Sequence, residues 1–259
     1  MYITSLEKAT AAGTAHALPD GSAVTTLVSR DICGAEGGEI AMVTVPAGVT
    51  RHLPRTPVEI GSVLVAGDAV VSVDEASGPG AGTALFVPPG SSFTVAAQRL
   101  AASLLAYVGG SVRWTDTDHH NAGGAAGPAD LFAVADQENH PFDIPDMGFF
   151  DMHARWLVDK ATRGSSTLTL GQSTFAPGTG RHALHRHPSA EEVFYVWEGQ
   201  AVHLTEDGAE HPMKAGELVF VPRNEWHGVR NVGDTPMRAI FGYLGAESLD
   251  AGGYELPQG

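Results

Sequence analysis

The spacing of four polar residues in the second half of the chain restricts the fold more than any other feature of the sequence. His185 and His187 are separated by one residue, Glu192 follows after four more, and His227 lies further along the chain. Because side chains alternate along a strand, two histidines in this pattern on one strand point to the same side. A carboxylate from the next strand and a third imidazole from a later one then close around one point, and these ligand types hold divalent first-row metals with coordination positions left open. The spacing therefore predicts a metal site inside a small β-barrel.

The rest of the sequence is typical of short strands joined by tight turns. The 259 residues include 32 glycines and 16 prolines, and no long amphipathic helical pattern is present. Short apolar runs alternate with Gly, Pro, Asp and Asn instead; they are Ile40–Val45, Thr83–Val87, Thr167–Leu170 and Leu218–Val221. This pattern favours an all-β sandwich or barrel. The length fits one large domain or two of moderate size.

Charge and composition exclude several classes of partner. The formal net charge of −15 at pH 7 argues against binding to nucleic acid or to an anionic membrane surface. The first residues contain no uninterrupted apolar run, and no segment approaches 18 apolar residues, so we expect neither export nor a membrane span. A single cysteine, Cys33, excludes an intrachain disulfide and suits a reducing compartment. We therefore expect a cytoplasmic protein that acts on a small molecule, and homo-oligomer formation stays open.

The segment around the four polar residues resembles the two-part signature of the cupin superfamily. Its first part reads G-x5-H-x-H-x3,4-E-x6-G and its second part reads G-x5-P-x-G-x2-H-x3-N. The matched positions are His185, His187, Glu192 and Gly199 in the first part and Gly216, Pro222, His227 and Asn231 in the second. The resemblance implies a cupin (jelly-roll) β-barrel with His185, His187, Glu192 and His227 as the metal ligands.

Two positions depart from the signature and one is ambiguous. The opening glycine of the first part falls on Thr179, between Gly178 and Gly180. Asn224 stands where the family usually has glycine, and asparagine is the non-glycine residue that best tolerates a left-handed backbone, so we expect the turn to be kept. Glu191 precedes Glu192, and the six-residue spacing to the closing glycine selects Glu192 as the ligand.

The chain also repeats itself at an offset of 132 to 134 residues. The segment Gly82–Gly90 has the same Gly and Pro spacing as Gly216–Asn224. The repeat predicts two tandem cupin barrels, a bicupin. We expect an N-terminal barrel at 1–115, a linker and interdomain segment at 116–150 and a C-terminal metal-binding barrel at 151–259. Within the connecting segment, Ala129–Ala135 is expected to form a short helix.

Only one copy of the repeat keeps the donors. The same offsets place Leu53, Arg55, Ile60 and Phe93 at the four ligand positions of the N-terminal barrel. His52 and Glu59 are each displaced by one residue, which on a strand points a side chain to the opposite face. We therefore expect a ligand-less, structural N-terminal barrel and one divalent metal per chain.

The residues around the donors indicate an apolar pocket. Alternation along the strand from Glu192 places Phe194 and Val196 on the ligand side, and Phe175 and Tyr243 lie on neighbouring predicted strands. Arg181 precedes the ligands and is the candidate for holding an anionic substrate, because a guanidinium binds a carboxylate bidentately. The candidate substrate-binding residues are thus Arg181, Phe194, Val196, Phe175 and Tyr243.

The resemblance implies several reaction types. Three neutral imidazoles and one carboxylate carry a net charge of +1 once a divalent metal binds, and they suit Fe, Mn, Ni, Cu, Co or Zn without selecting among them. The leading hypothesis is an oxygen-dependent dioxygenase similar to quercetinases, with Glu192 as the catalytic base. The alternative is a non-oxidative isomerase, decarboxylase or hydrolase similar to ureidoglycine aminohydrolases. A third hypothesis is a binding cupin without enzymatic activity.

Overall fold

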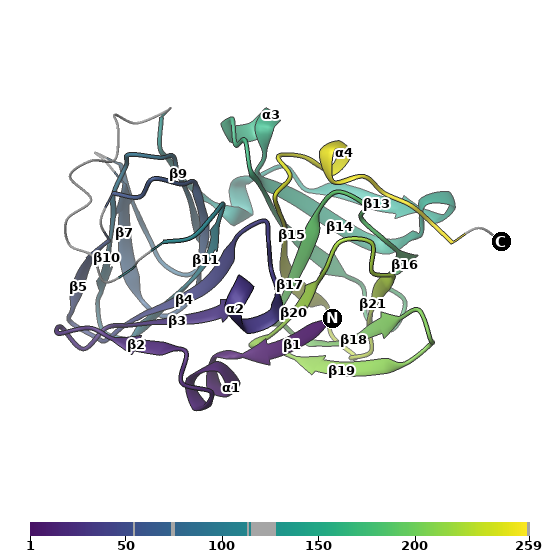
Figure 1. Ribbon diagram of the computed structural model, residues 1–259, viewed down its shortest axis with the longest axis horizontal. Helices are drawn as coiled ribbons and strands as arrows, with labels where there is room; N and C mark the ends of the chain where they lie inside the picture. The colour runs from purple at the N-terminus through teal and green to yellow at the C-terminus, as the bar shows by residue number, and fades with distance from the viewer. Residues whose placement is uncertain (54, 74–75, 113, 115–127, 258–259) are drawn as a thin grey trace.

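Two β-barrels lie side by side, the first mainly in purple to blue and the second mainly in teal to yellow (Figure 1). This arrangement is seen in a computed structural model, which describes residues 1–53, 55–73, 76–112, 114 and 128–257. The all-β fold of two tandem barrels is confirmed. Among the described residues, every helix is too short to cross a membrane.

The first barrel is built from two sheets. Its strands are β2 (Ala15–Ala17), β3 (Ala23–Val28), β4 (Glu39–Val45), β5 (Thr50–Leu53), β6 (Ile60–Ala66), β7 (Ala69–Val73), β8 (Ala76–Pro79), β9 (Thr83–Val87), β10 (Phe93–Ala97), β11 (Ala102–Val108) and β12 (Asp130–Ala133). The larger sheet has the order β12-β9-β6-β11-β4-β3-β2 and the smaller one β5-β10-β7-β8. One apolar cluster fills the space between them, with Leu64 and Leu104 from the larger sheet and Val71 from the smaller.

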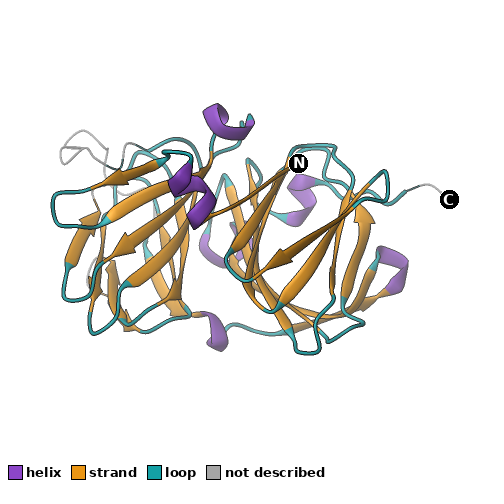
Figure 2. Ribbon diagram, turned by 90° about the horizontal axis from the view of Figure 1, so that it is seen from below, coloured by secondary structure: helices purple, strands orange, loops and turns teal. Residues whose placement is uncertain are grey.

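The second barrel is a single sheet that curls around its own core, as the turned view shows (Figure 2). Its strands are β1 (Tyr2–Ser5), β13 (His140–Ile144), β14 (Phe149–Val158), β15 (Leu168–Phe175), β16 (Arg181–His185), β17 (Glu191–Glu198), β18 (Gln200–Thr205), β19 (Glu210–Lys214), β20 (Glu217–Val221), β21 (His227–Asn231) and β22 (Met237–Leu244). The order is β1-β20-β17-β22-β15-β14-β16-β21-β18-β19, and β13 pairs with β14.

Helices are short and mark turns between strands. They are α1 (Leu6–Ala11), α2 (Arg30–Cys33), α3 (Lys160–Arg163), α4 (Leu249–Gly252) and the 3-10 helices η1 (Val134–Asp136) and η2 (Pro145–Met147). The helix expected at Ala129–Ala135 is wrong, because Asp130–Ala133 is a strand that pairs with β9. Backbone hydrogen bonds to an open sheet edge override the local helical preference there.

The boundaries of the barrels differ from the expected ones at two strands. β1 precedes the first barrel in the chain and yet pairs with β20 of the second. β12 lies in the expected interdomain segment and pairs with β9 of the first barrel. In both cases the added strand pairs with an open sheet edge, which is β20 for β1 and β9 for β12. The sequence repeat relates β9 and β20, so the two edges are equivalent. Residues 116–127 of the expected linker lie outside the described part of the chain.

The barrels share a core. One hydrophobic cluster combines Met42 and Tyr107 of the first barrel with Leu157, Phe220 and Ile240 of the second. The Tyr107 side chain is fully buried, and its hydroxyl donates to the carbonyl oxygen of Ile240 at 3.3 Å. An interface this apolar indicates that the two barrels pack as one unit.

The register of the repeat is confirmed by strand pairing. Leu53 and Phe93 are cross-strand partners in the first barrel, as His185 and His227 are in the second. Leu53, Phe93 and Ile60 are all buried in the apolar core of the first barrel, whereas Arg55 is exposed. Hydrophobic side chains therefore fill the place that polar donors take in the second barrel.

Candidate metal centre

Four polar side chains meet inside the second barrel. His185 ends β16, His187 follows two residues later, Glu192 lies near the start of β17 and His227 begins β21. The exposed fractions of the four are 1%, 2%, 8% and 4%, so all are buried. One ligand atom from each lies within 4.8 Å of the other three. The fold thus brings together the four residues that were selected from the sequence spacing. Glu192 rather than Glu191 is the carboxylate among them.

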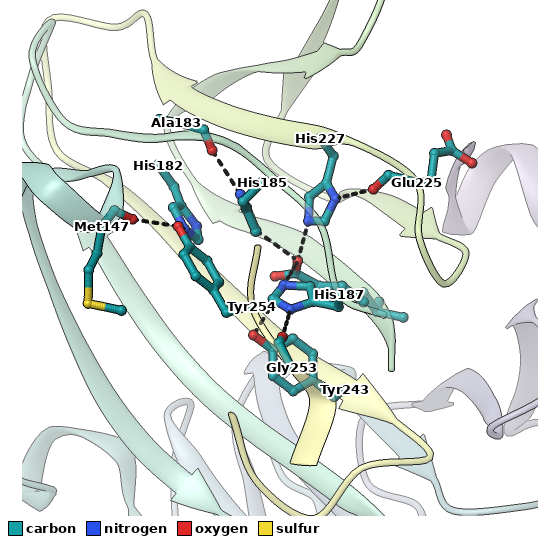
Figure 3. A network of polar contacts seen from close by, with 12 residues as sticks. Met147, His182, Ala183, His185, His187, Glu225, His227, Tyr243, Gly253 and Tyr254 are labelled. Atoms are coloured by element: carbon teal, nitrogen blue, oxygen red, sulfur yellow. Dashed lines mark hydrogen bonds and ion pairs between the residues drawn. The ribbon is translucent and has the colours of Figure 1, made fainter. Parts of the chain in front are cut away.

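A single carboxylate oxygen lies at the centre of the group. Glu192 Oε2 is 2.5 Å from Nε2 of His227, 3.2 Å from Nε2 of His187 and 3.7 Å from Nε2 of His185. Figure 3 shows the imidazole rings of His185, His187 and His227 turned toward one another. The Nε2 atoms are therefore the inward-facing atoms of all three rings.

The other ring nitrogen of each histidine is tied to the backbone. Nδ1 of His185 donates to the carbonyl oxygen of Ala183 at 2.8 Å, that of His187 to Gly253 at 2.7 Å and that of His227 to Glu225 at 2.9 Å. A carbonyl only accepts, so Nδ1 carries a proton, and in a neutral ring Nε2 then holds the lone pair. Metal-binding histidines are oriented in this way.

Burial and hydrogen bonding set the charges of the group. Burial raises the pKa of Glu192, but the three imidazoles around its carboxylate outweigh burial and hold the pKa well below its usual value. Burial together with the nearby His227 lowers the pKa of His185 to about 4. The pKa of His187 is raised, because its hydrogen bond to Glu192 outweighs burial. The group thus supplies a carboxylate and a neutral His185 imidazole, the protonation states that metal binding requires.

One of the four potential metal-ligand atoms has no hydrogen-bond partner in the described part of the chain. Nε2 of His185 is buried and makes no hydrogen bond among the described residues. An unsatisfied buried nitrogen is unfavourable by about 1–3 kcal/mol. A divalent cation among the four donors would remove this penalty and balance the carboxylate. The residues present therefore fit a divalent transition metal with three imidazole ligands and one carboxylate ligand.

A cavity of about 50 Å³ lies beside the donors. Its volume suits a few non-hydrogen atoms, since a water molecule needs roughly 10–15 Å³ on this measure. Aromatic and aliphatic side chains make most of the wall, and they include Phe142, Phe149, Met152, Trp156, Phe175, Phe194, Val229, Phe241 and Tyr243. Phe175, Phe194 and Tyr243, selected from the sequence as candidate substrate residues, thus line the cavity beside the donors.

Two of the selected substrate residues do not reach the cavity. Val196 lies two residues beyond Phe194 on β17 and is buried in the apolar core. Two residues advance a strand by about 6.6 Å, which carries Val196 past the cavity. Arg181 is exposed, and its guanidinium lies over the ring of Phe150 at 3.7 Å from the centroid.

An irregularity in β16 explains the position of Arg181. The pairing of β16 with β21 shifts register between His182 and His185. A bulge inverts the alternation of side chains, so His182 faces the cavity and Arg181 faces solvent. Strict alternation counted back from His185 places Arg181 inside, and the sequence carries no sign of the bulge.

Three further residues complete the site. His182 stacks between Phe149 and His185, at centroid distances of 4.2 Å and 3.7 Å. Its Nε2 is 3.0 Å from the hydroxyl of Tyr254, which donates to the carbonyl of Met147. His203 lines the cavity from β18. Alternation along β18 would have found His203, but nothing in the sequence marked Tyr254.

The C-terminal segment crosses the site after α4. Gly253 supplies the carbonyl that holds His187, and Tyr254 reaches under His182 (Figure 3). Glu255 pairs with Arg186 through the backbone and through an ion pair of 2.6 Å. Arg186, which lies between the ligands His185 and His187, is thereby held in place by the C-terminal segment.

Comparison with known proteins places this double barrel and its donor set in a family. Residues 171–243 match the model of the cupin domain. The protein SchB of Streptomyces halstedii is 33% identical over 99 residues, which are 38% of this chain and 70% of SchB. Gentisate 1,2-dioxygenase of Ralstonia sp is 33% identical over 76 residues, 29% of this chain and 21% of that enzyme. The chain belongs to the cupin superfamily.

Solved structures share both barrels. A variant of Bacillus subtilis oxalate decarboxylase superposes with a TM-score of 0.71 at 17% identity, over 98% of this chain and 79% of that one. A second structure of the same enzyme, described with Mn(II) centres, gives a TM-score of 0.69 at 17% identity, with the same coverage. At this level of identity the likeness defines the fold, which is that of a bicupin.

Proposed function

We propose that the second barrel holds one divalent transition metal and that the chain is a metal-dependent enzyme acting on a small oxygen-bearing organic substrate. The observation that carries the proposal is the buried, unpartnered Nε2 of His185 within a set of four converging donors. A barrel without a metal has no physical reason to bury three imidazoles and a carboxylate together. The Mn(II) centres of the oxalate decarboxylase make manganese the first metal to test among Fe, Mn, Ni, Cu, Co and Zn.

The residues around such a metal would have separate roles. The metal, when bound, would supply Lewis acidity and open positions for substrate oxygens. Glu192 is the one carboxylate among the described residues that line the cavity, so it is the candidate base. The aromatic walls exclude water and hold the apolar part of a substrate, with Phe175 and Phe194 packed edge to face at 6.1 Å.

Oxygen-dependent dioxygenation is the reaction that we propose first. The walls of the cavity are largely aromatic and aliphatic, which suits an apolar co-substrate such as dioxygen and would protect reactive intermediates from water. The local similarity to gentisate 1,2-dioxygenase supports the same reaction class. A substrate would present two adjacent oxygens to the metal, as in a hydroxy-ketone, a diketone or a phenol.

One observation favours a non-oxidative reaction as the second candidate. The hydroxyl of Tyr243 lies in the cavity wall, 3.3 Å from Nε2 of His187. Burial, with the nearby Glu192 carboxylate, raises the pKa of Tyr243 well above its usual value, so the phenol keeps its proton. A protonated phenol beside the donors is placed to protonate a substrate, which isomerisation and decarboxylation both require.

Metal content tests the proposal directly. The chain would be purified without a histidine tag, and metal per chain would be measured by elemental analysis for the wild type, His227→Ala and His153→Ala. His153 is an exposed histidine on β14 and serves as the matched control. We expect about one equivalent in the wild type and the control and almost none in His227→Ala. No metal in the wild type, even after reconstitution with Mn(II), would refute the proposal and favour a binding cupin.

Oxygen consumption separates the two reaction classes. Small hydroxy-ketones, diketones, phenols and 2-oxo acids would be screened with the metal-loaded protein, in air on an oxygen electrode and under anaerobic conditions. Turnover that consumes oxygen and is insensitive to Tyr243→Phe supports dioxygenation. Turnover without oxygen that falls at least tenfold in Tyr243→Phe supports the non-oxidative reaction.

A further inference from the structure

The cavity contains a fourth histidine that the donor set does not use. His203 comes from β18, is 2% exposed and lines the cavity. Its Nε2 is buried and has no hydrogen bond partner among the described residues. Its ring lies parallel to that of His227, with the centroids 5.9 Å apart. His203 is outside the group of donors that lie within 4.8 Å of one another, so it is too far away to be a ligand and close enough to meet a group bound beside the metal.

The other polar groups of the wall differ in their contacts. His182 is hydrogen-bonded to Tyr254, whereas the Tyr243 hydroxyl contacts Nε2 of His187, the atom that would bind the metal. Among the described residues, the buried wall atoms without a partner are, besides that of the ligand His185, Nε2 of His203 and Oγ of Ser173. Burying such atoms is unfavourable unless a ligand satisfies them. The cavity is therefore built to receive a molecule with polar atoms beyond those that a metal takes.

The net charge of the metal-loaded site restricts the class of molecule that can bind in the cavity. With one carboxylate and three neutral imidazoles, a divalent metal leaves the buried site with a net charge of +1. No further acidic side chain lines the cavity among the described residues. A buried positive charge favours a bound anion that neutralises it. A small monoanion therefore fits this site better than a neutral compound.

We propose that His203 is a substrate-positioning residue that hydrogen-bonds the third oxygen of a small 2-oxo or 2-hydroxy acid, whose other two oxygens face the metal. Such an acid offers one carboxylate oxygen and the neighbouring oxo or hydroxy oxygen for chelation. The second carboxylate oxygen is left over, and His203 is the wall histidine with a buried, unpartnered nitrogen among the described residues that can meet it. This proposal rests on the proposed metal site and specifies the substrate that the site takes.

Two chelating probes of similar size test it without relying on turnover. Pyruvate chelates through two oxygens and leaves one carboxylate oxygen free, whereas acetylacetone chelates through both of its oxygens and has no further polar atom. The protein would be loaded with Co(II), and the dissociation constant of each probe would be measured from the visible absorption of the cobalt. The variants are His203→Phe, which keeps a planar ring, and His203→Gln, which keeps a donor.

We expect His203→Phe to weaken pyruvate binding about tenfold, the usual effect of losing one hydrogen bond to a charged group. Acetylacetone binding and Co(II) affinity should stay within about twofold of the wild type. His203→Gln should recover part of the pyruvate affinity. His153→Phe, the same change on the outer face of β14, should alter none of these values.

Each of the following results would overturn the proposal. Equal weakening of both probes, or of neither, would mean that His203 only packs against the site. Loss of Co(II) affinity in His203→Phe, with His203→Gln equally impaired, would make His203 part of the metal site instead. Failure of the wild type to bind Co(II) would remove the proposed function and this proposal together, whereas normal Co(II) and pyruvate binding in every His203 variant would remove this proposal alone.

Discussion

Glu59 and Glu191 occupy equivalent positions in the two barrels, and each carboxylate accepts hydrogen bonds from the other barrel. Glu59 accepts from the backbone N–H groups of Ser166 and Thr167, at 2.9 Å and 3.1 Å. Glu191 accepts from the backbone N–H groups of Glu36 and Gly37, both at 2.8 Å. The repeat thus uses one acidic position twice, as an anchor between barrels. The same arrangement turns Glu191 away from the metal centre and leaves Glu192 to face it.

The Glu59 anchor should contribute measurably to stability. Its carboxylate is 7% exposed and also accepts from the hydroxyls of Ser165, Ser166 and Thr167. Glu59→Ala would leave these buried donors unsatisfied, so we expect a loss of about 2–4 kcal/mol in the free energy of unfolding. Urea denaturation followed by circular dichroism would measure it. Glu206→Ala, at an exposed position, is the control and should change the value by less than about 0.5 kcal/mol. A similarly small change in Glu59→Ala would contradict the anchoring role.

The contribution of Glu59 should depend on pH. Burial raises its pKa, but hydrogen bonds from Ser166, Ser165 and Thr167 outweigh burial and lower the pKa below its usual value. A carboxyl group with a lowered pKa in the folded state stabilises the protein above the pKa of the unfolded chain, about 4.3. That stability is lost as the pH falls through the lower folded-state pKa. The difference in unfolding free energy between wild type and Glu59→Gln should therefore be constant from pH 6 to 5 and shrink below about pH 4.

The metal centre should be separable from the fold. His187 lies after β16, and its Nδ1 is held by Gly253 rather than by the barrel core. We expect His187→Ala to lose most of the bound metal, at least a hundredfold in affinity, while circular dichroism and the elution volume stay unchanged. Global unfolding of the variant would show instead that the four donors are needed for folding.

The first barrel should not share metal binding. Arg55 occupies the position equivalent to His187 and is exposed, while Leu53 and Phe93 fill the neighbouring ligand positions with apolar side chains. Arg55→Ala should keep the metal content of the wild type by elemental analysis. Loss of half of the metal would mean that the first barrel contributes a site of its own.

Asn224 provides a test of backbone strain beside the metal centre. It has a φ of 63°, the left-handed conformation expected from the signature glycine at this position, and its side chain is exposed. Asn224→Gly should be neutral or stabilising by up to about 1 kcal/mol, and Asn224→Ala should be destabilising by about 1 kcal/mol. The pair would be compared by thermal unfolding. Equal melting temperatures in the two variants would exclude strain as the reason for the residue.

Local spacing was sufficient to predict the donor set. His-x-His on a strand, the carboxylate five positions later and the distant His227 were selected because side-chain alternation and ligand chemistry are local properties. The repeat likewise located Leu53, Ile60 and Phe93, whose pairing matches that of the second barrel. Phe175, Phe194 and Tyr243 lie in the cavity wall for the same reason, since each is on the inner face of its strand.

Other parts of the site could not be predicted because they depend on distant contacts. The bulge in β16 exchanges Arg181 for His182 at the cavity, and its cause is pairing with β21 rather than any local signal. Tyr254 joins the site only because the C-terminal segment returns across the barrel. The exchange of β1 and β12 between the barrels depends on which sheet edges are open in the assembled fold.

The sequence by itself determined the fold class, the number of barrels and the four donors of the metal centre, because alternation, turn chemistry and ligand spacing act over a few residues. Only the tertiary structure decided which edge strand completes which barrel, which side chain of β16 enters the cavity and that Nε2 of His203 has no hydrogen-bond partner among the described residues. These features depend on contacts between segments that are far apart in the chain. Whether a buried polar group finds a hydrogen-bond partner is decided by those contacts.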